Sequence, residues 1–212
     1  MKIVVCIKQV PDTKGGVQFN PDGTLNRAAM LAIMNPDDKA GLEAALRLKD
    51  QYGAEVTVLT MGLPKAADVL REALAMGADK AILVTDRVLG GADTWATSST
   101  IAAALRKLDY DLIITGRQAI DGDTAQVGPQ ISEHLDIPVI SYAQDIKSRR
   151  RQCDRTASVR RQISCTERQK MPCLITALSE LNEPRYMTPG GIFDACDAEI
   201  TTWGRADLTT PG

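Results

Sequence analysis

Short runs of apolar residues recur along residues 1–142, and each is followed by a polar or glycine-containing stretch. Their interiors, such as Ile3–Ile7 and Leu112–Ile114, are continuously apolar and do not alternate. A continuous run is typical of a strand that is buried on both faces, as in a parallel sheet covered by helices. The sequence predicts strands at Lys2–Lys8, Glu55–Met61, Lys80–Thr85, Asp111–Gly116 and Pro138–Tyr142.

Helical periodicity fills the intervals between these strands. Asn35 and Pro36 predict a capped helix start, two acids follow in the first turn, and Gly53 predicts the helix end. Further helices are predicted at Pro64–Gly77, from about Asp93–Thr94 and from about Asp123–Thr124. The alternation of strands and helices predicts an α/β fold: a doubly wound, Rossmann-like parallel sheet with an extended C-terminal tail.

The pattern changes after Lys147. Residues 148–171 hold few apolar residues and no clear period, so we expect an irregular segment there. Pro172–Thr176 then predicts one more strand, and the loop-rich tail after it is too poor in apolar residues to form its own core. We therefore divide the chain into an α/β domain at 1–147, the irregular segment at 148–171, and a last strand with its tail at 172–212.

Charge is distributed unevenly along the chain. The formal net charge is −2, but residues 147–170 hold nine Lys or Arg and two Asp or Glu, a local +7, so the remainder carries −9. No aromatic residue interrupts this basic segment. An acidic protein with one basic segment of this kind does not fit a nucleic-acid binder.

Cysteine and histidine content excludes further classes of site. The five cysteines are irregularly spaced without a CxxC pair, and His134 is the one histidine, so the ligand set for zinc or an Fe–S cluster is missing. No apolar run approaches the ~20 residues that span a bilayer, and the N-terminus resembles a first strand more than a signal peptide. We expect a cytoplasmic protein with reduced thiols and no membrane insertion.

The loop at 115–129 carries the strongest candidate chemistry. Gly116 and Gly122 allow the backbone to approach a ligand, and the helix after the loop offers free N–H groups and its positive dipole end. Arg117 adds a fixed cation. Neutral hydrogen-bonding side chains follow at Gln118, Thr124 and Gln126. Because ligands bind at the carboxyl ends of parallel strands, the sequence predicts a site there for the pyrophosphate and ribose of a nucleotide.

Other interpretations of this loop stay open. An ordinary turn, in which Asp123 or Thr124 caps the helix, would use the same residues. Asp121 and Asp123 could also act as acid and base, but capping and solvated loop roles are the favoured explanation for them. The chain has no GxGxxG after its first strand, no GxxxxGK[ST] and no visible nucleophile–base pair, so a standard NAD fold, a P-loop ATPase and a nucleophilic enzyme are not supported.

Several motifs together resemble the β subunit of electron-transfer flavoproteins, over nearly the whole chain. They are Cys6–Asp12, Met34–Asp37, Ala73–Asp79, Gly116–Pro129 and Leu181–Tyr186. The resemblance implies an αβ heterodimer, in which the α subunit holds an electron-shuttling FAD and the β subunit holds a second nucleotide in its sheet crevice. It implies that this nucleotide contacts Cys6, Asn35, Pro36, Asp37, Asp38, Met61, Gly116, Arg117, Gln118, Ala119, Asp121, Gly122, Asp123, Thr124, Ala125, Gln126 and Val127.

Two stretches resemble the electron-bifurcating group, which holds a second FAD where ordinary members hold AMP. One is Asp121–Pro129. The other is Gly90–Ser98, which places the hydroxyls of Thr94, Thr97 and Ser98 at a helix start, where they could bond a flavin ring edge. Thr94 and Thr97 therefore join the predicted cofactor-binding residues.

Membership of the bifurcating group implies that NADH gives a hydride to this FAD. Electrons are then expected to pass to the α-subunit FAD with an acyl-CoA dehydrogenase, and to a low-potential acceptor such as ferredoxin or flavodoxin. The chain would be redox-active only through its flavin, without catalytic residues of its own. An AMP-containing β subunit, or a stand-alone adenine-nucleotide sensor, remains an alternative.

The chain departs from the family pattern at three places. Residues 148–169 are a run rich in Arg, Ser and Cys where members carry a strand–turn–strand, and a shifted reading frame would produce such a run. The tail ends at Gly212, before the long arm that usually wraps the α subunit, so we expect a truncated arm. Arg185–Asp194 coincides with the loop that docks acyl-CoA dehydrogenases, and Pro189 stands where AMP-type members have a leucine.

Overall fold

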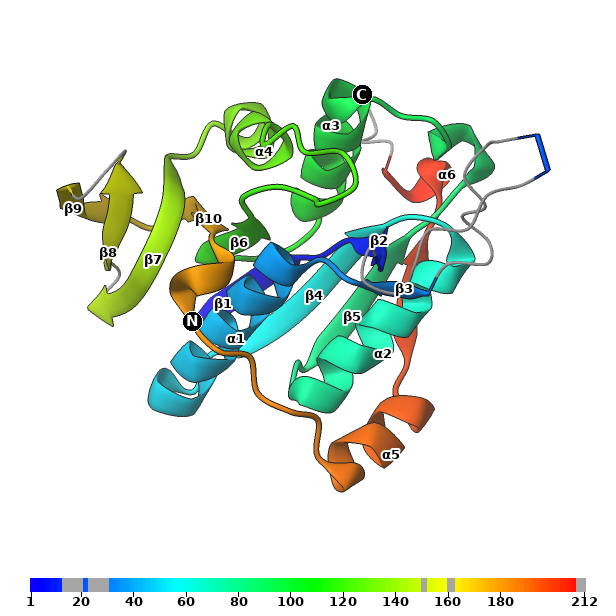
Figure 1. Ribbon diagram of the computed structural model, residues 1–212, viewed down its shortest axis with the longest axis horizontal. Coiled ribbons are helices and arrows are strands. Elements are labelled where there is room, and N and C mark those ends of the chain that lie inside the picture. Colours follow the sequence, from blue (N-terminus) through cyan, green and yellow to red (C-terminus); the bar gives the residue numbers. More distant parts are fainter. Residues whose placement is uncertain (13–20, 23–30, 150–151, 160–162, 209–212) are drawn as a thin grey trace.

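The computed structural model describes residues 1–12, 21–22, 31–149, 152–159 and 163–208. Its main sheet has the strand order β11-β5-β4-β1-β6-β10-β7-β8-β9, and every neighbouring pair from β11 to β7 is parallel (Figure 1). The parallel strands are β11 (Ile200–Trp203), β5 (Lys80–Val84), β4 (Glu55–Met61), β1 (Lys2–Cys6), β6 (Leu112–Gly116), β10 (Cys173–Ala177) and β7 (Val139–Arg149). All the strands predicted from apolar runs are therefore present.

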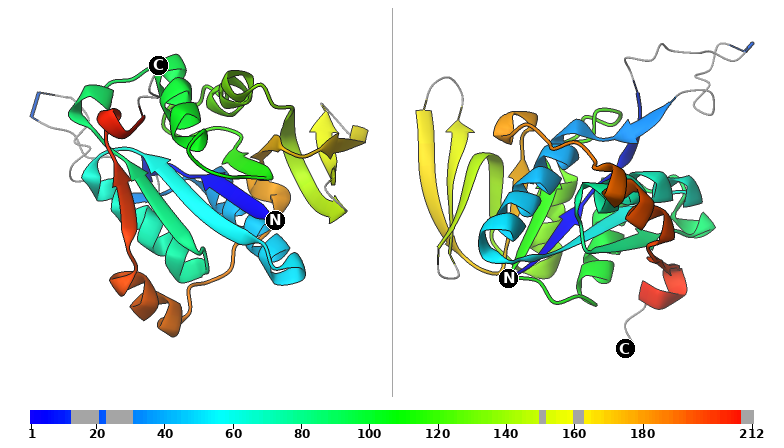
Figure 2. Two further views of the ribbon diagram at one scale, coloured as in Figure 1. Left: turned by 180° about the vertical axis from the view of Figure 1, so that it is seen from behind. Right: turned by 90° about the horizontal axis from the view of Figure 1, so that it is seen from below.

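Helices cover both faces of this sheet, so the fold is the predicted doubly wound α/β arrangement. On one face, α1 (Pro36–Tyr52) and α2 (Ala67–Met76) pack against side chains such as Ile3 and Val5 of β1. On the other, α3 (Thr94–Leu105) and α4 (Val127–Leu135) pack against Val4 and Cys6 of the same strand. Figure 1 shows α1 and α2 in front of the strands. In the left-hand view of Figure 2, which is seen from behind, the strands lie in front of these two helices. Burial on both faces explains why these strands are continuously apolar.

The ends of α1 and α2 follow the sequence signals closely. Pro36 is the first residue of α1, and Gly53 ends it in the left-handed conformation, with φ of 65°. The short 3-10 helix η1 (Pro64–Ala66) leads into α2, and Gly77 ends that helix. Proline supplies the φ of a first helical residue, while glycine adopts the left-handed φ of a helix end without steric cost.

The described residues of the segment at 148–171 are almost all in strands, which corrects the expectation of an irregular segment. β7 extends to Arg149, and β8 (Gln152–Val159) and β9 (Ile163–Lys170) continue the sheet by antiparallel pairing. Backbone hydrogen bonds hold a strand whatever its side chains are, so a polar segment can form one without a hydrophobic alternation. In Figure 2, these strands stand at one end of the molecule. The division of the chain at 147 and 171 stays a prediction.

The tail lies along the core, as its low apolar content predicts. After the 3-10 helix η3 (Ser179–Leu181), α5 (Pro189–Asp197) packs on α2, and β11 adds to the sheet edge beside β5. Arg71 of α2 donates hydrogen bonds to the carbonyls of Ala195 (2.5 Å) and Cys196 (3.0 Å) at the end of α5. The chain also forms η2 (Arg87–Leu89), α6 (Arg205–Leu208) and a separate antiparallel pair of β2 (Gln9–Pro11) and β3 (Ala32–Met34).

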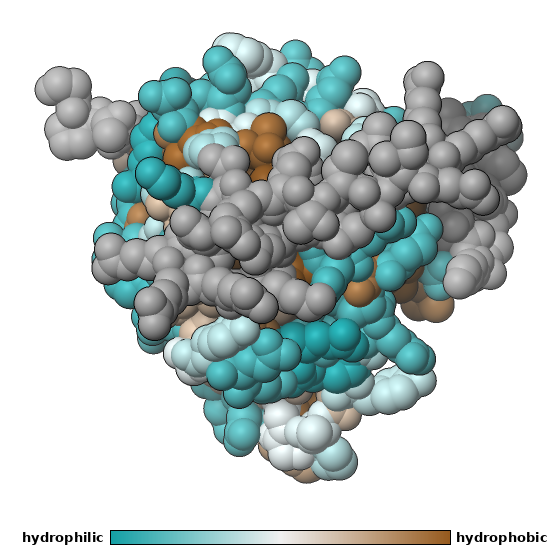
Figure 3. Space-filling view, turned by 90° about the vertical axis from the view of Figure 1, so that its left-hand side faces the viewer, coloured by the Kyte–Doolittle hydropathy of each residue, from teal (hydrophilic) through white to brown (hydrophobic). Residues whose placement is uncertain are grey.

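Exposed apolar side chains are scattered, except near α5. Figure 3 shows that hydrophilic residues predominate among the coloured residues on one side of the molecule. On the segment that leads into α5, Tyr186 is 92% exposed, and Phe193 within the helix is 73% exposed. Apolar residues that gather on one exposed segment are typical of a contact surface for another protein.

Candidate functional site

A cavity of about 670 Å³ opens at the carboxyl ends of β1, β4, β5 and β6. After β1 the chain builds β4 and β5 on one side of it, and then β6 on the other. The crevice beyond β1 and β6 is therefore the switch point at which doubly wound sheets bind ligands. The volume falls within the ~300–1,000 Å³ of small-molecule sites.

Most of the predicted site residues line this cavity. They are Cys6, Asp38, Met61, Thr94, Thr97, Gly116, Arg117, Gln118, Ala119, Gly122, Asp123, Thr124, Ala125, Gln126 and Val127. The remaining predicted residues, Asn35, Pro36, Asp37 and Asp121, are not part of its lining. Sequence reasoning did not single out Lys8, Leu63 or Leu89, which also line it; their signal was their position just after a strand.

The loop after β6 stays non-helical for longer than the sequence predicts. The next helix, α4, begins at Val127 and not near Asp123 or Thr124. Asp123 and Ala125 both have left-handed backbones, with φ of 53° and 52°, which a helix start at either residue would not allow. Asp123 therefore does not cap α4, and its carboxylate instead accepts a hydrogen bond from Gln118 within the loop. The result is an irregular segment that borders the cavity from Arg117 to Gln126.

The first turn of α1 holds the ends of β1 and β6 together. Buried Asp38 accepts hydrogen bonds from the backbone N–H groups of Lys8 (2.8 Å) and Gly116 (2.9 Å). A Cβ at Gly116 would lie 2.2 Å from Asp38 Oδ1, so this position requires the absence of a side chain. Burial raises the pKa of the Asp38 carboxyl to about 7.

Each cation of the cavity is already engaged by an acid. Lys8 Nζ lies 2.7 Å from Asp121 Oδ1, which links the end of β1 to the loop after β6. Arg117 Nε lies 3.4 Å from Asp37 Oδ2, an electrostatic pairing without hydrogen-bond geometry. Burial raises the pKa of Asp37, although Arg117 opposes the shift. An anionic ligand would therefore meet cations whose charges are already partly balanced.

Two helix starts border the cavity from its other side. Asp93 caps α3 by accepting from the Ala96 N–H at 2.8 Å, so the hydroxyls of Thr94 and Thr97 are not needed as caps. Thr94 Oγ1 donates to Gln126 Oε1 at 3.2 Å and so connects α3 with the loop. The N-terminus of α4 has no side-chain cap, and its first residue, Val127, lines the cavity.

Two groups with candidate chemistry prove inert or remote. Ser98 lies outside the cavity lining; it is fully buried, donates to the Trp95 carbonyl and lies 3.2 Å from His134 Nε2. Cys6 does line the cavity, but burial raises the pKa of its thiol to about 12. It therefore stays protonated and supplies packing surface, since the thiolate is the reactive form.

Within the described residues, His, Cys, Asp and Glu form no group that could hold a metal ion. Likewise, none of the helices in the described part of the chain is long and apolar enough to cross a membrane.

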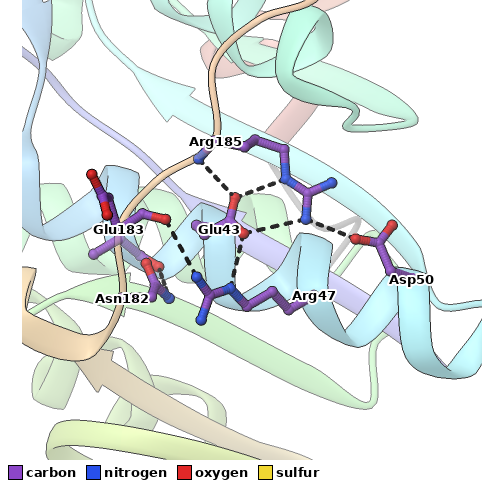
Figure 4. A network of polar contacts seen from close by, with 7 residues as sticks. Glu43, Arg47, Asp50, Asn182, Glu183 and Arg185 are labelled. Atoms are coloured by element: carbon purple, nitrogen blue, oxygen red, sulfur yellow. Dashed lines mark hydrogen bonds and ion pairs between the residues drawn. The ribbon is translucent and has the colours of Figure 1, made fainter.

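The docking segment predicted at Arg185–Asp194 begins with a polar anchor on α1. Arg185 donates from its backbone N–H (3.1 Å) and its Nε (2.8 Å) to Glu43 Oε2, and its Nη2 lies 2.8 Å from Asp50 Oδ2. Arg47 Nε also donates to Glu43, at 3.0 Å. Figure 4 shows Glu43 between the two guanidinium groups. The anchor fixes the chain immediately before the exposed Tyr186.

The fold and the site define a doubly wound α/β protein of the Rossmann-like type, with a ligand-sized crevice at its switch point. The model of the electron transfer flavoprotein domain matches residues 22–208. The chain belongs to the electron transfer flavoprotein family.

The relatives include proteins from several bacteria. The chain is 53% identical over 212 residues to the electron transfer flavoprotein subunit beta of Clostridium acetobutylicum, a match that covers 98% of this chain and 80% of that one. It is 52% identical over 214 residues to the caffeyl-CoA reductase-Etf complex subunit CarD of Acetobacterium woodii, with the same coverage. It is 44% identical over 218 residues to protein FixA of Azorhizobium caulinodans, covering 98% and 76%.

Proposed function

We propose that the chain is the β-type electron-transfer subunit of a heterodimeric flavoprotein and that its cavity holds a second FAD. The observation that carries this proposal is the cavity of about 670 Å³ at the switch point, bordered by an irregular loop and by a helix start without a side-chain cap. The names of the relatives support it, because one belongs to a caffeyl-CoA reductase complex and another to an acryloyl-CoA reductase.

The residues of the cavity fit a dinucleotide. The amides at Val127 and Gly128 lie at the positive end of α4, where a pyrophosphate is favoured. Gly128 also packs against β6 and β10 so closely that a Cβ would lie 2.7 Å from Thr115 Oγ1. Thr94 and Thr97 offer hydroxyls at the start of α3. Because the cations are paired with acids, we infer that backbone N–H groups carry most of the phosphate recognition.

A bound FAD would supply the redox chemistry, which is acceptance of a hydride from NADH and release of the two electrons singly. The chain itself would place the flavin, exclude water from it and tune its potential through fixed dipoles. In this proposal the complex passes electrons toward the α-subunit FAD with an acyl-CoA dehydrogenase, and toward ferredoxin or flavodoxin. Tyr186 and Phe193, exposed beyond the Arg185 anchor, would form the contact with the dehydrogenase.

The nucleotide content of the purified complex tests the proposal. The chain would be produced together with its α subunit, and the bound nucleotides extracted and identified by chromatography. We expect two FAD per heterodimer. One FAD with one AMP would reject the bifurcating assignment and keep the family function, whereas a monomer that carries ATP or AMP would support the sensor alternative.

A matched pair of variants locates the second flavin. Thr97 lines the cavity, whereas Thr100, one turn further along α3, lies outside the lining and donates to the Ala96 carbonyl of its own helix at 2.7 Å. Thr97→Val should shift the absorption spectrum and the reduction potential of one flavin, and Thr100→Val should change neither. Equal spectra for Thr97→Val and the unmodified protein would argue against a flavin ring at α3.

A further inference from the structure

Asn35 is fully buried, yet it does not line the cavity. It precedes α1 at the position where an asparagine usually caps the helix with its side chain, but it makes no such cap. Its amide reaches across to the loop after β6 instead. Nδ2 donates to the Gln118 carbonyl at 2.8 Å, and Oδ1 accepts from the Ile120 N–H at 3.1 Å.

With these two hydrogen bonds, the Asn35 amide pairs with the loop backbone as the backbone of a neighbouring strand would. The side chain satisfies one carbonyl and one N–H two residues apart, and only a primary amide both donates and accepts with this geometry. The loop needs such support, because Asp123 and Ala125 hold left-handed backbones that a non-glycine residue adopts only when its surroundings enforce them.

The contact also joins the loop to the part of α1 that fixes the strand ends. The backbone N–H of Asn35 donates to the Lys8 carbonyl at 2.9 Å, while Asp38, one turn later, holds the N–H groups of Lys8 and Gly116. Asn35 therefore ties the loop to the same rigid corner from which β1 and β6 approach the cavity.

We propose that Asn35 is a positioning residue for the nucleotide site: its amide holds the loop from Arg117 to Gln126 in the shape that borders the cavity, without contact to the ligand. The proposal rests on the proposed function of this cavity. In this proposal, Asn35 acts on the nucleotide through the loop backbone, in place of the direct contact expected from the sequence.

Asn35→Ser and Asn35→Ala separate this role from helix capping. Serine caps a helix about as well as asparagine, but it is too short to span both loop groups. If the amide bridge matters, both variants weaken the site equally; if capping matters, serine restores it. Asn182→Ala is the matched control, because Asn182 Nδ2 also donates to a carbonyl of α1, that of Ala40 at 3.0 Å, and this hydrogen bond does not involve the loop.

The measurements use the full chain in complex with its α subunit. Amide hydrogen exchange of residues 117–126 reports on the loop whether or not a nucleotide is bound. We expect both Asn35 variants to exchange there at least tenfold faster than the unmodified protein, and Asn182→Ala to match it. After removal of bound nucleotide, FAD and AMP are titrated back by calorimetry; loss of two hydrogen bonds should raise the Kd about tenfold to thirtyfold.

Unchanged exchange in the Asn35 variants would overturn the positioning role, even if the complex proved to hold no nucleotide. So would full rescue by serine, or an equal rise in Kd for Asn182→Ala. A complex without nucleotide in which the Asn35 variants still loosen the loop would reject the proposed ligand and keep the loop anchor. The two failures are thus distinguishable.

Discussion

Replacement of Glu43 by glutamine should destabilise the protein through one buried contact. The Glu43 side chain is 4% exposed and accepts hydrogen bonds from two arginines, so glutamine would leave Arg185 without its buried counter-charge. Hydrogen bonds to charged groups contribute ~1.5–3 kcal/mol each. Because the Arg185 side chain is 32% exposed, we discount the loss of a buried ion pair to about 2–3 kcal/mol. For a chain of this size, that corresponds to a fall in Tm of roughly 4–12 °C.

The pH dependence of stability provides a second test of the role of Glu43. The pKa of Glu43 is lowered, because the hydrogen bonds from Arg185 and Arg47 outweigh the desolvation by burial. A lowered carboxyl pKa contributes stability above the unfolded-state pKa of about 4.5, and this stability is lost as the pH falls through the folded-state value. The difference in Tm between the unmodified protein and Glu43→Gln should therefore be constant near neutral pH and shrink below about pH 4.5.

Asp50→Asn is the control for this prediction. Asp50 contacts the same guanidinium at 2.8 Å, but its side chain is 59% exposed, and exposed ion pairs contribute ~0–1 kcal/mol. Differential scanning calorimetry from pH 3.5 to 7.5 would compare the three proteins. A Tm loss in Glu43→Gln no larger than that in Asp50→Asn, or one that persists unchanged at pH 3.5, would refute the argument that burial makes Glu43 the central acid.

Two further pairs of glycine variants test close approaches of the backbone. Gly116→Ala should destabilise by at least ~1–3 kcal/mol, because its Cβ would meet Asp38 at 2.2 Å, whereas Gly122→Ala meets no protein atom and should retain the Tm of the unmodified protein. Gly191→Ala should lower Tm and expose the contact between α2 and α5 to proteolysis, since its Cβ would lie 2.5 Å from a backbone carbonyl of α2, while Gly190→Ala should match the unmodified protein. Equal behaviour within either pair would contradict the packing described.

Features that depend on local sequence alone were predictable. The continuous apolar run of β1 predicts a strand because it fits burial on both faces. The proline at the start of α1 and the glycine at its end predict the bounds of that helix because each favours a particular φ. The start of α4 could not be predicted in this way, because the loop before it is held by hydrogen bonds to distant residues and contains left-handed residues such as Asp123. Such anchors lie far apart along the chain: Asn35 and Ile120 are separated by 85 positions.

The strands at the sheet ends were missed for a different reason. β11 is a short edge strand whose exposed and half-buried residues give no apolar run. β8 and β9 are polar segments whose pairing is antiparallel and local, so only the backbone register reveals them. Hydrophobic periodicity reports which residues are apolar, so a strand whose sequence is polar gives no such signal even though its backbone pairs.

The position of the cavity could be predicted from the sequence, but the roles of individual residues could not. The acids of α1 show why. In sequence, Asp37 and Asp38 fit a helix start by opposing its dipole, and either a ligand or solvent could lie beside them. Their burial removes the solvent explanation, and both accept hydrogen bonds from backbone N–H groups: Asp37 from Ser179, and Asp38 from the ends of β1 and β6. Further along the same helix, Glu43 holds the Arg185 segment. One helix therefore holds a strand end beside the cavity and the base of the predicted docking segment, so damage to its packing should affect both surfaces together, whereas substitutions of lining residues outside this helix should affect only the cavity.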